Sequence, residues 1–233
     1  MFGTAYDAEY FGGRSSRGSR ARNAGLLTLI HRRYGGLTLL DIGHGTGDFL
    51  ELARKLYDTS GFEVSPFAHA HAKQRLGPTV DLALGDGTTL PYPNESYDIV
   101  VALDVLEHVD DVDRTLSNVY RVLRSGGSFV MSVPNTCSLG RHLKGPSWFA
   151  YRDPTHVRLL APQEWLDSLR RAQLLVVRYG SDCLWDPPYF AGPGLKSLER
   201  LVLGTGTFFK RRLWPISSNL RGENLLVIAT KTI

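Results

Sequence analysis

The sequence predicts an α/β fold built on a parallel sheet that helices cover on both faces. Between residues 37 and 133, short and almost continuously apolar segments alternate with segments of helical spacing. Strands that are buried on both faces have this uninterrupted apolar character. The chain has 233 residues, of which 42% are hydrophobic, so one domain with a full core is expected.

Five strands are expected in the first part of the chain, at residues 37–42, 61–64, 80–84, 97–103 and 128–133. Helices are expected from Phe49 to Tyr57, from Ser65-Pro66 onwards, and from Val112 to Leu123, where Gly126-Gly127 would end the last of them. Beyond residue 134, residues 135–161 show no clear period, 162–172 predict a helix, and 174–179 and 225–230 predict two late strands. The connection 181–223 between these strands is longer than usual.

Composition excludes several classes of protein. The 27 basic and 23 acidic side chains give a net charge of +4, too small to argue for nucleic acid by itself. Cys137 and Cys183 do not make a disulfide framework or a CxxC zinc site, and Cys137 is expected to be a small buried residue. With no run of 18 apolar residues and no apolar leader in MFGTAYDAEYFGG, we expect a cytoplasmic protein.

The residues at the carboxyl ends of the strands are the candidate ligand contacts, because ligands of open parallel sheets bind outside these ends. After the first strand, Gly43, Gly45 and Gly47 allow a sharp turn and a close approach of a ligand to the backbone. Asp48 stands where a dinucleotide-binding loop has its third glycine, and it would repel a pyrophosphate. The loop therefore favours a zwitterionic ligand, with an ordinary tight turn as the alternative.

Two acids lie at the ends of the next two strands. Glu63 can accept hydrogen bonds from both hydroxyls of a ribose. Asp86 can accept from an exocyclic amine such as adenine N6, while Gly87 leaves room for the base. Either acid alone would be an ordinary surface residue. Their placement at successive strand ends predicts a nucleoside site.

The ordered segments LLDIGHGTG, GFEVS, ALGDGTTLPYPNESYDIVVALDVLEHV and LRSGGSFVMSVPN resemble the class I S-adenosylmethionine-dependent methyltransferases, in particular those with small-molecule, quinone-ring and natural-product acceptors. The resemblance covers about residues 37–180 and, more weakly, 224–231. It implies a Rossmann-like seven-stranded, mostly parallel sheet whose last strand is antiparallel. It also implies cofactor contacts for Asp41, Gly43, His44, Gly45, Gly47, Glu63, Val64, Asp86, Gly87, Leu103, Asp104 and His108.

Two residues depart from the family's pattern. His44 replaces a small or acidic loop residue, and Ser60 stands where a Tyr or Asp is common. Neither change removes the residues expected to bind S-adenosylmethionine.

The chemistry that the resemblance implies is an in-line displacement at an electrophilic methyl group. The protein has to hold the acceptor in line and, where needed, remove its proton. His156 and His108 are the candidate bases, with Asp153 orienting His156; the alternative is that all three are structural. No metal is expected, because no acidic cluster demands one and His69 and His71 point to different faces of a helix.

The N-terminal region is rich in arginine. Residues 14–33 contain no acid, and Leu26, Leu27, Ile30 and Tyr34 form a helical stripe. One interpretation is a helix with a solvated basic face. The other is that residues 1–36 form a basic lid on a methyltransferase domain of residues 37–233, with one Arg pairing the cofactor carboxylate and with Tyr6, Tyr10 and Phe11 in the lid.

Segments 135–161 and 181–223 are expected to cover the acceptor. Their aromatic residues suit a flat or apolar small molecule, although a satellite core or a homodimer contact is also consistent with them. The aromatics are Trp148, Phe149, Tyr151, Trp185, Tyr189, Phe190, Phe208, Phe209 and Trp214. Residues 208–214 also carry cations and suit a peripheral membrane contact. The expected activity is methyl transfer to oxygen or nitrogen of a small molecule. The alternatives are an RNA or protein methyltransferase and a non-catalytic S-adenosylmethionine-binding module.

Overall fold

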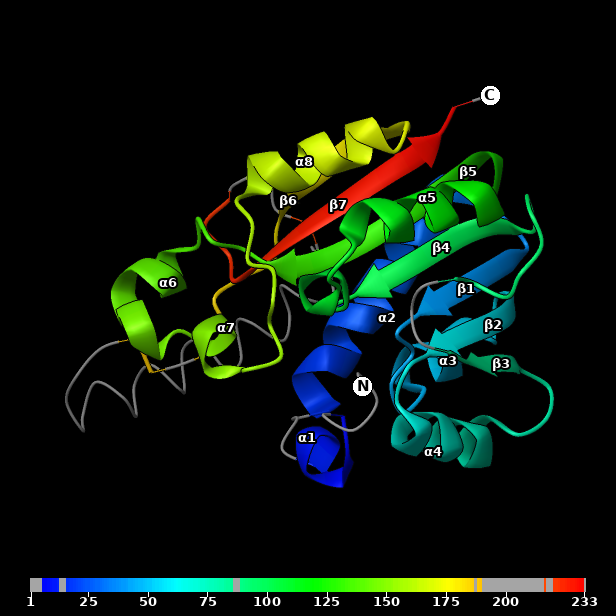
Figure 1. Cartoon of the computed structure of the whole chain (residues 1–233), viewed down its shortest axis with the longest axis horizontal. Coiled ribbons are helices and arrows are strands. Elements are labelled where there is room, and N and C mark those ends of the chain that lie inside the picture. The colour runs from blue at the N-terminus through cyan, green and yellow to red at the C-terminus, as the bar shows by residue number, and fades with distance from the viewer. Residues whose placement is uncertain are drawn as a thin grey trace.

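The computed structural model describes residues 6–12, 16–85, 89–186, 188–189, 216 and 220–232. At its centre is a seven-stranded sheet with the order β3-β2-β1-β4-β5-β7-β6 (Figure 1). The strands are β1 (Thr38–Ile42), β2 (Asp58–Glu63), β3 (Asp81–Leu84), β4 (Tyr97–Leu103), β5 (Leu123–Pro134), β6 (Leu174–Ser181) and β7 (Asn224–Lys231). The first five pair in parallel, and β7 runs antiparallel to both of its neighbours. The expected Rossmann-like fold is confirmed.

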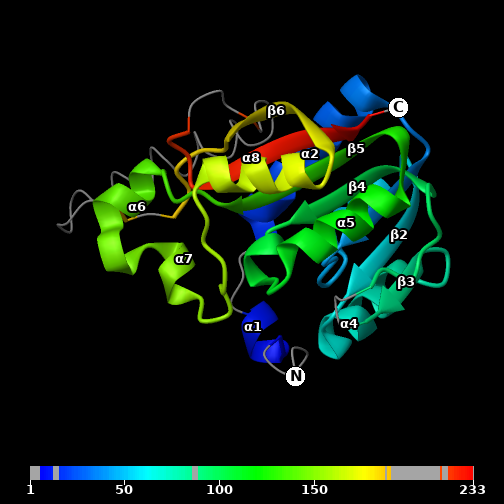
Figure 2. The ribbon, with the colours of Figure 1, turned by 45° about the horizontal axis from the view of Figure 1, so that its top comes forward.

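Helices cover both faces of the sheet (Figure 2). They are α1 (Ala8–Gly12), α2 (Ser16–Tyr34), α3 (Asp48–Ala53), α4 (Pro66–Leu76), α5 (Val112–Val122), α6 (Leu139–Lys144), α7 (Phe149–Arg152) and α8 (Pro162–Arg171), with the 3₁₀ turns η1 (Leu106–His108) and η2 (Gly145–Ser147). One core lies between the sheet and α5 and α8, where Leu116 and Trp165 are buried. The other lies beneath α2, α3 and α4, where Ile30 and Leu50 are completely buried.

Two strands are longer than their apolar runs. β2 begins at Asp58 rather than at Gly61, because Asp58 to Ser60 pair with β1 although their side chains are polar. β5 begins at Leu123, which pairs with Tyr97, so Gly126 and Gly127 lie inside a strand and do not end a helix. The predicted helix 49–57 is shorter and ends at Ala53. Main-chain pairing set these bounds, which side-chain pattern alone does not report.

Residues 135–161, which have no sequence period, contain α6, η2 and α7 to one side of the sheet (Figure 1). Their order comes from individual contacts. Ser138 Oγ caps α6 by accepting from Arg141 N at 2.9 Å. Trp148 is fully buried, and its Nε1 donates to Glu223 Oε2 at 2.7 Å. The segment is therefore tied to the start of β7.

Two further observations concern the surface. Cys137 is exposed, so the expectation of a buried thiol is wrong. It follows the buried end of β5 and lies in the turn that leads into α6. Within the described residues, none of the helices is sufficiently long and apolar to pass through a membrane.

Candidate functional site

A cavity of about 330 Å³ lies at the carboxyl ends of β1, β2 and β4. This is the edge at which ligands of parallel sheets bind. The predicted cofactor residues that line it are Gly43, Gly45, Glu63, Val64, Leu103, Asp104 and His108. Asp41, His44 and Gly47 do not line it, and Asp86 and Gly87 lie outside the described residues.

The glycine loop after β1 is held against the end of β2. The amides of Gly43 and His44 both donate to Phe62 O, at 2.7 and 3.3 Å. Gly43 has a φ of +71°, and a Cβ there would lie 2.4 Å from Val105 Cγ2. Both facts require glycine, which alone adopts positive φ without cost. The loop consequently presents backbone, not side chains, to the cavity.

Glu63 is 5% exposed and is fixed by three backbone amides. Its Oε2 accepts from Gly45 N at 2.8 Å, and its Oε1 accepts from Val64 N at 2.8 Å and Ser65 N at 2.9 Å. A carboxylate offers about four acceptor positions, so capacity for a ligand hydroxyl remains. The contact with Gly45 joins the ends of β1 and β2.

Two predicted residues lie behind the cavity. Asp41 is 3% exposed; burial, together with the charge of Glu63, raises its pKa well above the usual value. His44 donates from Nδ1 to Gly45 O at 2.7 Å, and burial lowers its pKa to about 4. His44 thus holds Gly45 within the loop, and Asp41 lies in the buried end of β1 just before it.

Asp104, directly after β4, has a φ of +59°, which is a strained conformation for a residue other than glycine. Its Oδ1 accepts from Ser132 Oγ at 2.6 Å and from Asn224 Nδ2 at 3.2 Å, and its Oδ2 pairs with Arg22 Nη1 at 2.7 Å. Arg22 is 4% exposed, so a fully solvated basic face is wrong for this residue of α2. The network holds Asp104 toward the cavity despite the strain.

The N-terminal segment closes one side of the cavity, and Tyr6, Tyr10 and Phe11 all line it. Ser65 Oγ donates to Tyr6 O at 2.6 Å, and the rings of Phe11 and Phe67 stack with centroids 6.1 Å apart. These contacts attach α1 to the region between β2 and α4. The three aromatics that the sequence analysis assigns to the lid therefore lie at the cavity wall.

The candidate bases lie beside the cavity. The ring of His108 is 4.7 Å from that of His156 and 5.7 Å from that of Tyr6. Asp153 Oδ2 is 3.7 Å from His156 Nε2, and Asp153 Oδ1 accepts from Thr155 Oγ1 at 2.5 Å. Burial acts to raise the pKa of Asp153, but the hydrogen bonds from Thr155 outweigh it and lower that pKa.

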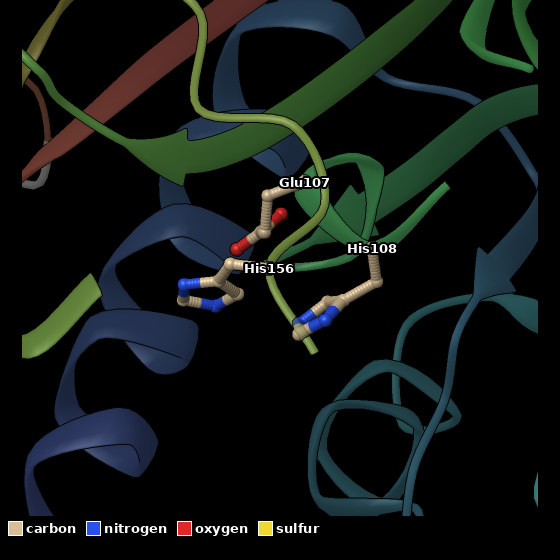
Figure 3. A group of neighbouring side chains, drawn as sticks. All are labelled: Glu107, His108 and His156. Atoms are coloured by element: carbon tan, nitrogen blue, oxygen red, sulfur yellow. The ribbon is translucent and has the colours of Figure 1, made fainter. Parts of the chain in front are cut away.

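The structure adds a carboxylate to these histidines. Glu107, 1% exposed, lies next to them (Figure 3). The family resemblance places the segment Leu106–His108, which follows β4, at the border of the active site, whereas nothing in the sequence distinguishes Arg22 from the other arginines.

The aromatic residues expected around the acceptor are only partly described. Tyr151 is 46% exposed, and the indole N–H of Trp148 donates a hydrogen bond to Glu223. Tyr189 OH also donates to Glu223, at 2.5 Å, and burial raises the pKa of Glu223. Trp148 and Tyr189 thus share Glu223 as a hydrogen-bond acceptor. Phe190, Phe208, Phe209 and Trp214 lie outside the described residues.

Comparisons with known proteins agree with this geometry. Residues 40–131 match the family described as a methyltransferase domain. A probable S-adenosylmethionine-dependent methyltransferase of Mycolicibacterium smegmatis is 33% identical over 73% of this chain and 62% of its own length. A ubiquinone biosynthesis O-methyltransferase of Paramagnetospirillum magneticum is 37% identical over 46% of this chain and 44% of its own. The chain therefore spans between two fifths and two thirds of the length of these relatives.

A solved structure extends the agreement to the whole fold. A SAM dependent methyltransferase from Archaeoglobus fulgidus superimposes with a TM-score of 0.67, covering 97% of this chain and 100% of that one at 20% identity. At this identity the likeness concerns the fold alone.

Proposed function

Because the chain carries a class I S-adenosylmethionine-dependent methyltransferase domain, we propose that it transfers the methyl group of S-adenosylmethionine to an oxygen or nitrogen of a small, aromatic or apolar molecule. The observation that carries the proposal is the cavity at the strand ends, where the glycine loop and Glu63 lie side by side under Tyr6 and Phe11. A backbone loop beside a buried carboxylate suits a zwitterionic nucleoside better than a diphosphate.

The residues present fit this cofactor. In the proposal, Gly43 and Gly45 receive the methionine part, Glu63 and Val64 the ribose, and Leu103 and Asp104 the region of the sulfonium. Asp41, His44 and Gly47 support the loop, and Asp86 and Gly87 receive the adenine. Residues 1–36 act as the lid; the described part that supports this is Tyr6, Tyr10 and Phe11 on the cavity wall.

The chain's own task is to place and deprotonate the acceptor. The bound cofactor supplies a methyl group that is already electrophilic, so positioning accounts for much of the catalysis. The Nδ1 of His156 lies 2.7 Å from Ala150 O and must donate to it, which leaves Nε2 of the neutral ring as an acceptor. His108 has the same arrangement toward Thr155 O at 3.1 Å. Both rings are thus oriented to take a proton through Nε2, and Asp153 Oδ2, 3.7 Å from His156 Nε2, would stabilise that ring once it has taken the proton.

The proposed acceptor class is supported by the apolar and aromatic wall beside His108, which includes Tyr6, Tyr10 and Phe11. We also propose that segments 135–161 and 181–223 cover the acceptor. A cytoplasmic location, a homodimer and a membrane contact through residues 208–214 are proposals as well, and residues 208–214 lie outside the described part of the chain.

Methyl transfer from radiolabelled S-adenosylmethionine into a cell extract tests the proposal. The extract is separated into small molecules, RNA and protein before counting. We expect label in the small-molecule fraction, with His156→Ala reducing it and the partly exposed α8 variant Asp167→Ala leaving it unchanged. Label confined to RNA or protein would overturn the small-molecule acceptor, and no transfer with retained cofactor binding would indicate a binding module.

A further inference from the structure

Three potential metal ligands lie together beside the cofactor cavity. One ligand atom each of Glu107, His108 and His156 lies within 4.8 Å of the other two (Figure 3). Glu107 and His108 belong to η1, and His156 comes from the connection between α7 and α8. Two ligand atoms on one cation stand about 3–4 Å apart when each bond is about 2.0–2.2 Å, so a small movement of the rings closes the set.

Both imidazole rings are oriented as metal-binding rings are. Nδ1 of His156 donates to Ala150 O at 2.7 Å, and Nδ1 of His108 donates to Thr155 O at 3.1 Å. A histidine that binds a metal almost always donates its other ring N–H to a carbonyl or carboxylate, which fixes the tautomer and the direction of the ring. Here a main-chain carbonyl holds the Nδ1 side of each ring, so Nε2 is the ring atom that would bind the cation.

The two segments that carry the ligands are joined by main-chain bonds. Glu107 O accepts from Val157 N and Arg158 N, both at 3.0 Å. The turn around His156 is closed by His156 N donating to Asp153 O at 3.2 Å. The cluster is therefore built by the fold and does not depend on a chance approach of flexible side chains.

The surrounding charge suits a dication. Glu107 and Asp153 are carboxylates, and Asp153 Oδ2 lies 3.7 Å from His156 Nε2. Arg22, whose charge interacts with that of Glu107, is paired with Asp104 at 2.7 Å. Two acidic side chains beside two imidazole rings favour a divalent cation at this place.

We infer that Glu107, His108 and His156 form a site for a divalent cation of the zinc, cobalt or manganese kind. Two imidazoles and one carboxylate favour these ions over Mg²⁺, which prefers oxygen ligands. No metal was expected from the sequence because no acidic cluster occurs and the two neighbouring histidines of one helix point to different faces. The present set instead combines ligands from two segments that are distant in the sequence.

The site also narrows the acceptor, a conclusion that rests on the proposed function. Because His108 lines the cavity, a cation held by its Nε2 lies at the cavity wall. Three protein ligands leave positions open for an oxygen of the acceptor. With a cation bound, Nε2 of both rings is a ligand and no longer acts as a base. The cation instead helps a hydroxyl of the acceptor lose its proton to solvent, after which the oxygen forms the bond to the methyl group and the C–S electron pair stays on sulfur. The site thus favours hydroxyl acceptors over amines.

Titration of the chelator-treated whole chain with Co²⁺, followed by visible absorption, tests the site. We expect one Co²⁺ per chain, and at least about tenfold weaker binding in His108→Ala and in Glu107→Gln. His142→Ala removes an exposed histidine of α6 and is the matched control, which should bind as the wild type does. No cobalt spectrum, or equal affinity in all variants, would overturn the site.

Calorimetry with S-adenosylhomocysteine on the same samples separates the two proposals. Retained binding shows that a variant is folded, and failure of the wild type to bind it counts against the proposed function alone. Where the wild type binds S-adenosylhomocysteine but no cobalt, only the cation site fails. Chelation that abolishes methyl transfer, with recovery on adding Zn²⁺ or Mn²⁺, supports the role toward hydroxyl acceptors. Full activity of the chelated protein overturns it.

Discussion

The guanidinium of Arg22 lies 2.7 Å from the carboxylate of Asp104 and joins α2 to the end of β4. Burial acts to lower the pKa of Arg22, but the charge and hydrogen bond of Asp104 outweigh it and raise that pKa. Asp104 is at the same time held in a left-handed conformation by Ser132 and Asn224. One ion pair thus connects α2, the middle of the sheet and the cavity.

Replacing Arg22 by Ala should destabilise the fold by about 3 kcal/mol, since removing one member of a buried pair leaves the other charge uncompensated. Arg20→Ala, an exposed change on the same helix, should stay within about 0.5 kcal/mol. Urea unfolding of both variants measures the difference. Equal stability of the two would mean that the Arg22–Asp104 pair contributes nothing.

Gly43→Ala should be far more harmful than Gly126→Ala. Both glycines have positive φ, +71° and +76°, so both variants carry a backbone strain of about 1–2 kcal/mol. A Cβ at Gly43 also meets Val105 Cγ2 at 2.4 Å, while a Cβ at Gly126 meets nothing within 4 Å. We expect Gly43→Ala alone to weaken S-adenosylhomocysteine binding in calorimetry. Unchanged binding in Gly43→Ala would show that the glycine loop does not contact the ligand.

Stability should fall between about pH 6.5 and pH 4 because of His44. Burial lowers the pKa of His44 from 6.5 to about 4, so in this window the unfolded chain binds a proton that the folded chain does not. The contribution is fully present above pH 6.5 and amounts to about 3 kcal/mol at 1.36 kcal/mol per pH unit. The ring of His69, 5.8 Å away, also has a lowered pKa and acts in the same direction.

Urea unfolding at several pH values checks the His44 prediction. The slope between pH 4 and pH 6.5 should become shallower in His44→Gln. A slope identical to that of the wild type would exclude His44 as its source.

Trp148→Phe should cost about 1.5–3 kcal/mol more than Trp165→Phe. Both indoles are buried, at 0% and 1% exposed, so the lost apolar area is similar. Trp148 Nε1 donates to Glu223 Oε2, whereas Trp165 Nε1 has no hydrogen-bond partner within the described part of the chain. The difference therefore isolates one hydrogen bond to an acidic side chain. Thermal unfolding of the two variants measures it, and equal losses would contradict it.

Much of the sheet could be predicted, because the strands that hold the site are buried and their apolar runs are visible. Tyr97–Leu103 has the predicted bounds, and Ser65 caps α4 by accepting from Ala68 N at 3.1 Å. The bounds of β2 and β5 were missed because backbone pairing extends them through polar and glycine residues. Periodicity reports side chains, while main-chain pairing sets strand ends.

The site was predictable where residues lie at the carboxyl ends of strands, as Gly43 and Glu63 do. It was not predictable where contacts join distant segments. The pairing of Arg22 with Asp104, the meeting of His156 with Glu107, and the capture of Trp148 by Glu223 depend on the packed fold. No local pattern distinguishes these residues from neighbours of the same type.

Isothermal calorimetry of S-adenosylhomocysteine with the wild type, Glu63→Ala and the surface variant Asp167→Ala tests the central claim most directly. The account predicts binding by the wild type and Asp167→Ala and no binding of NAD. It predicts a loss of about 1–3 kcal/mol in Glu63→Ala, since a buried carboxylate that accepts ligand hydroxyls is removed. Equal affinity in all three proteins, or a preference for NAD, would contradict it.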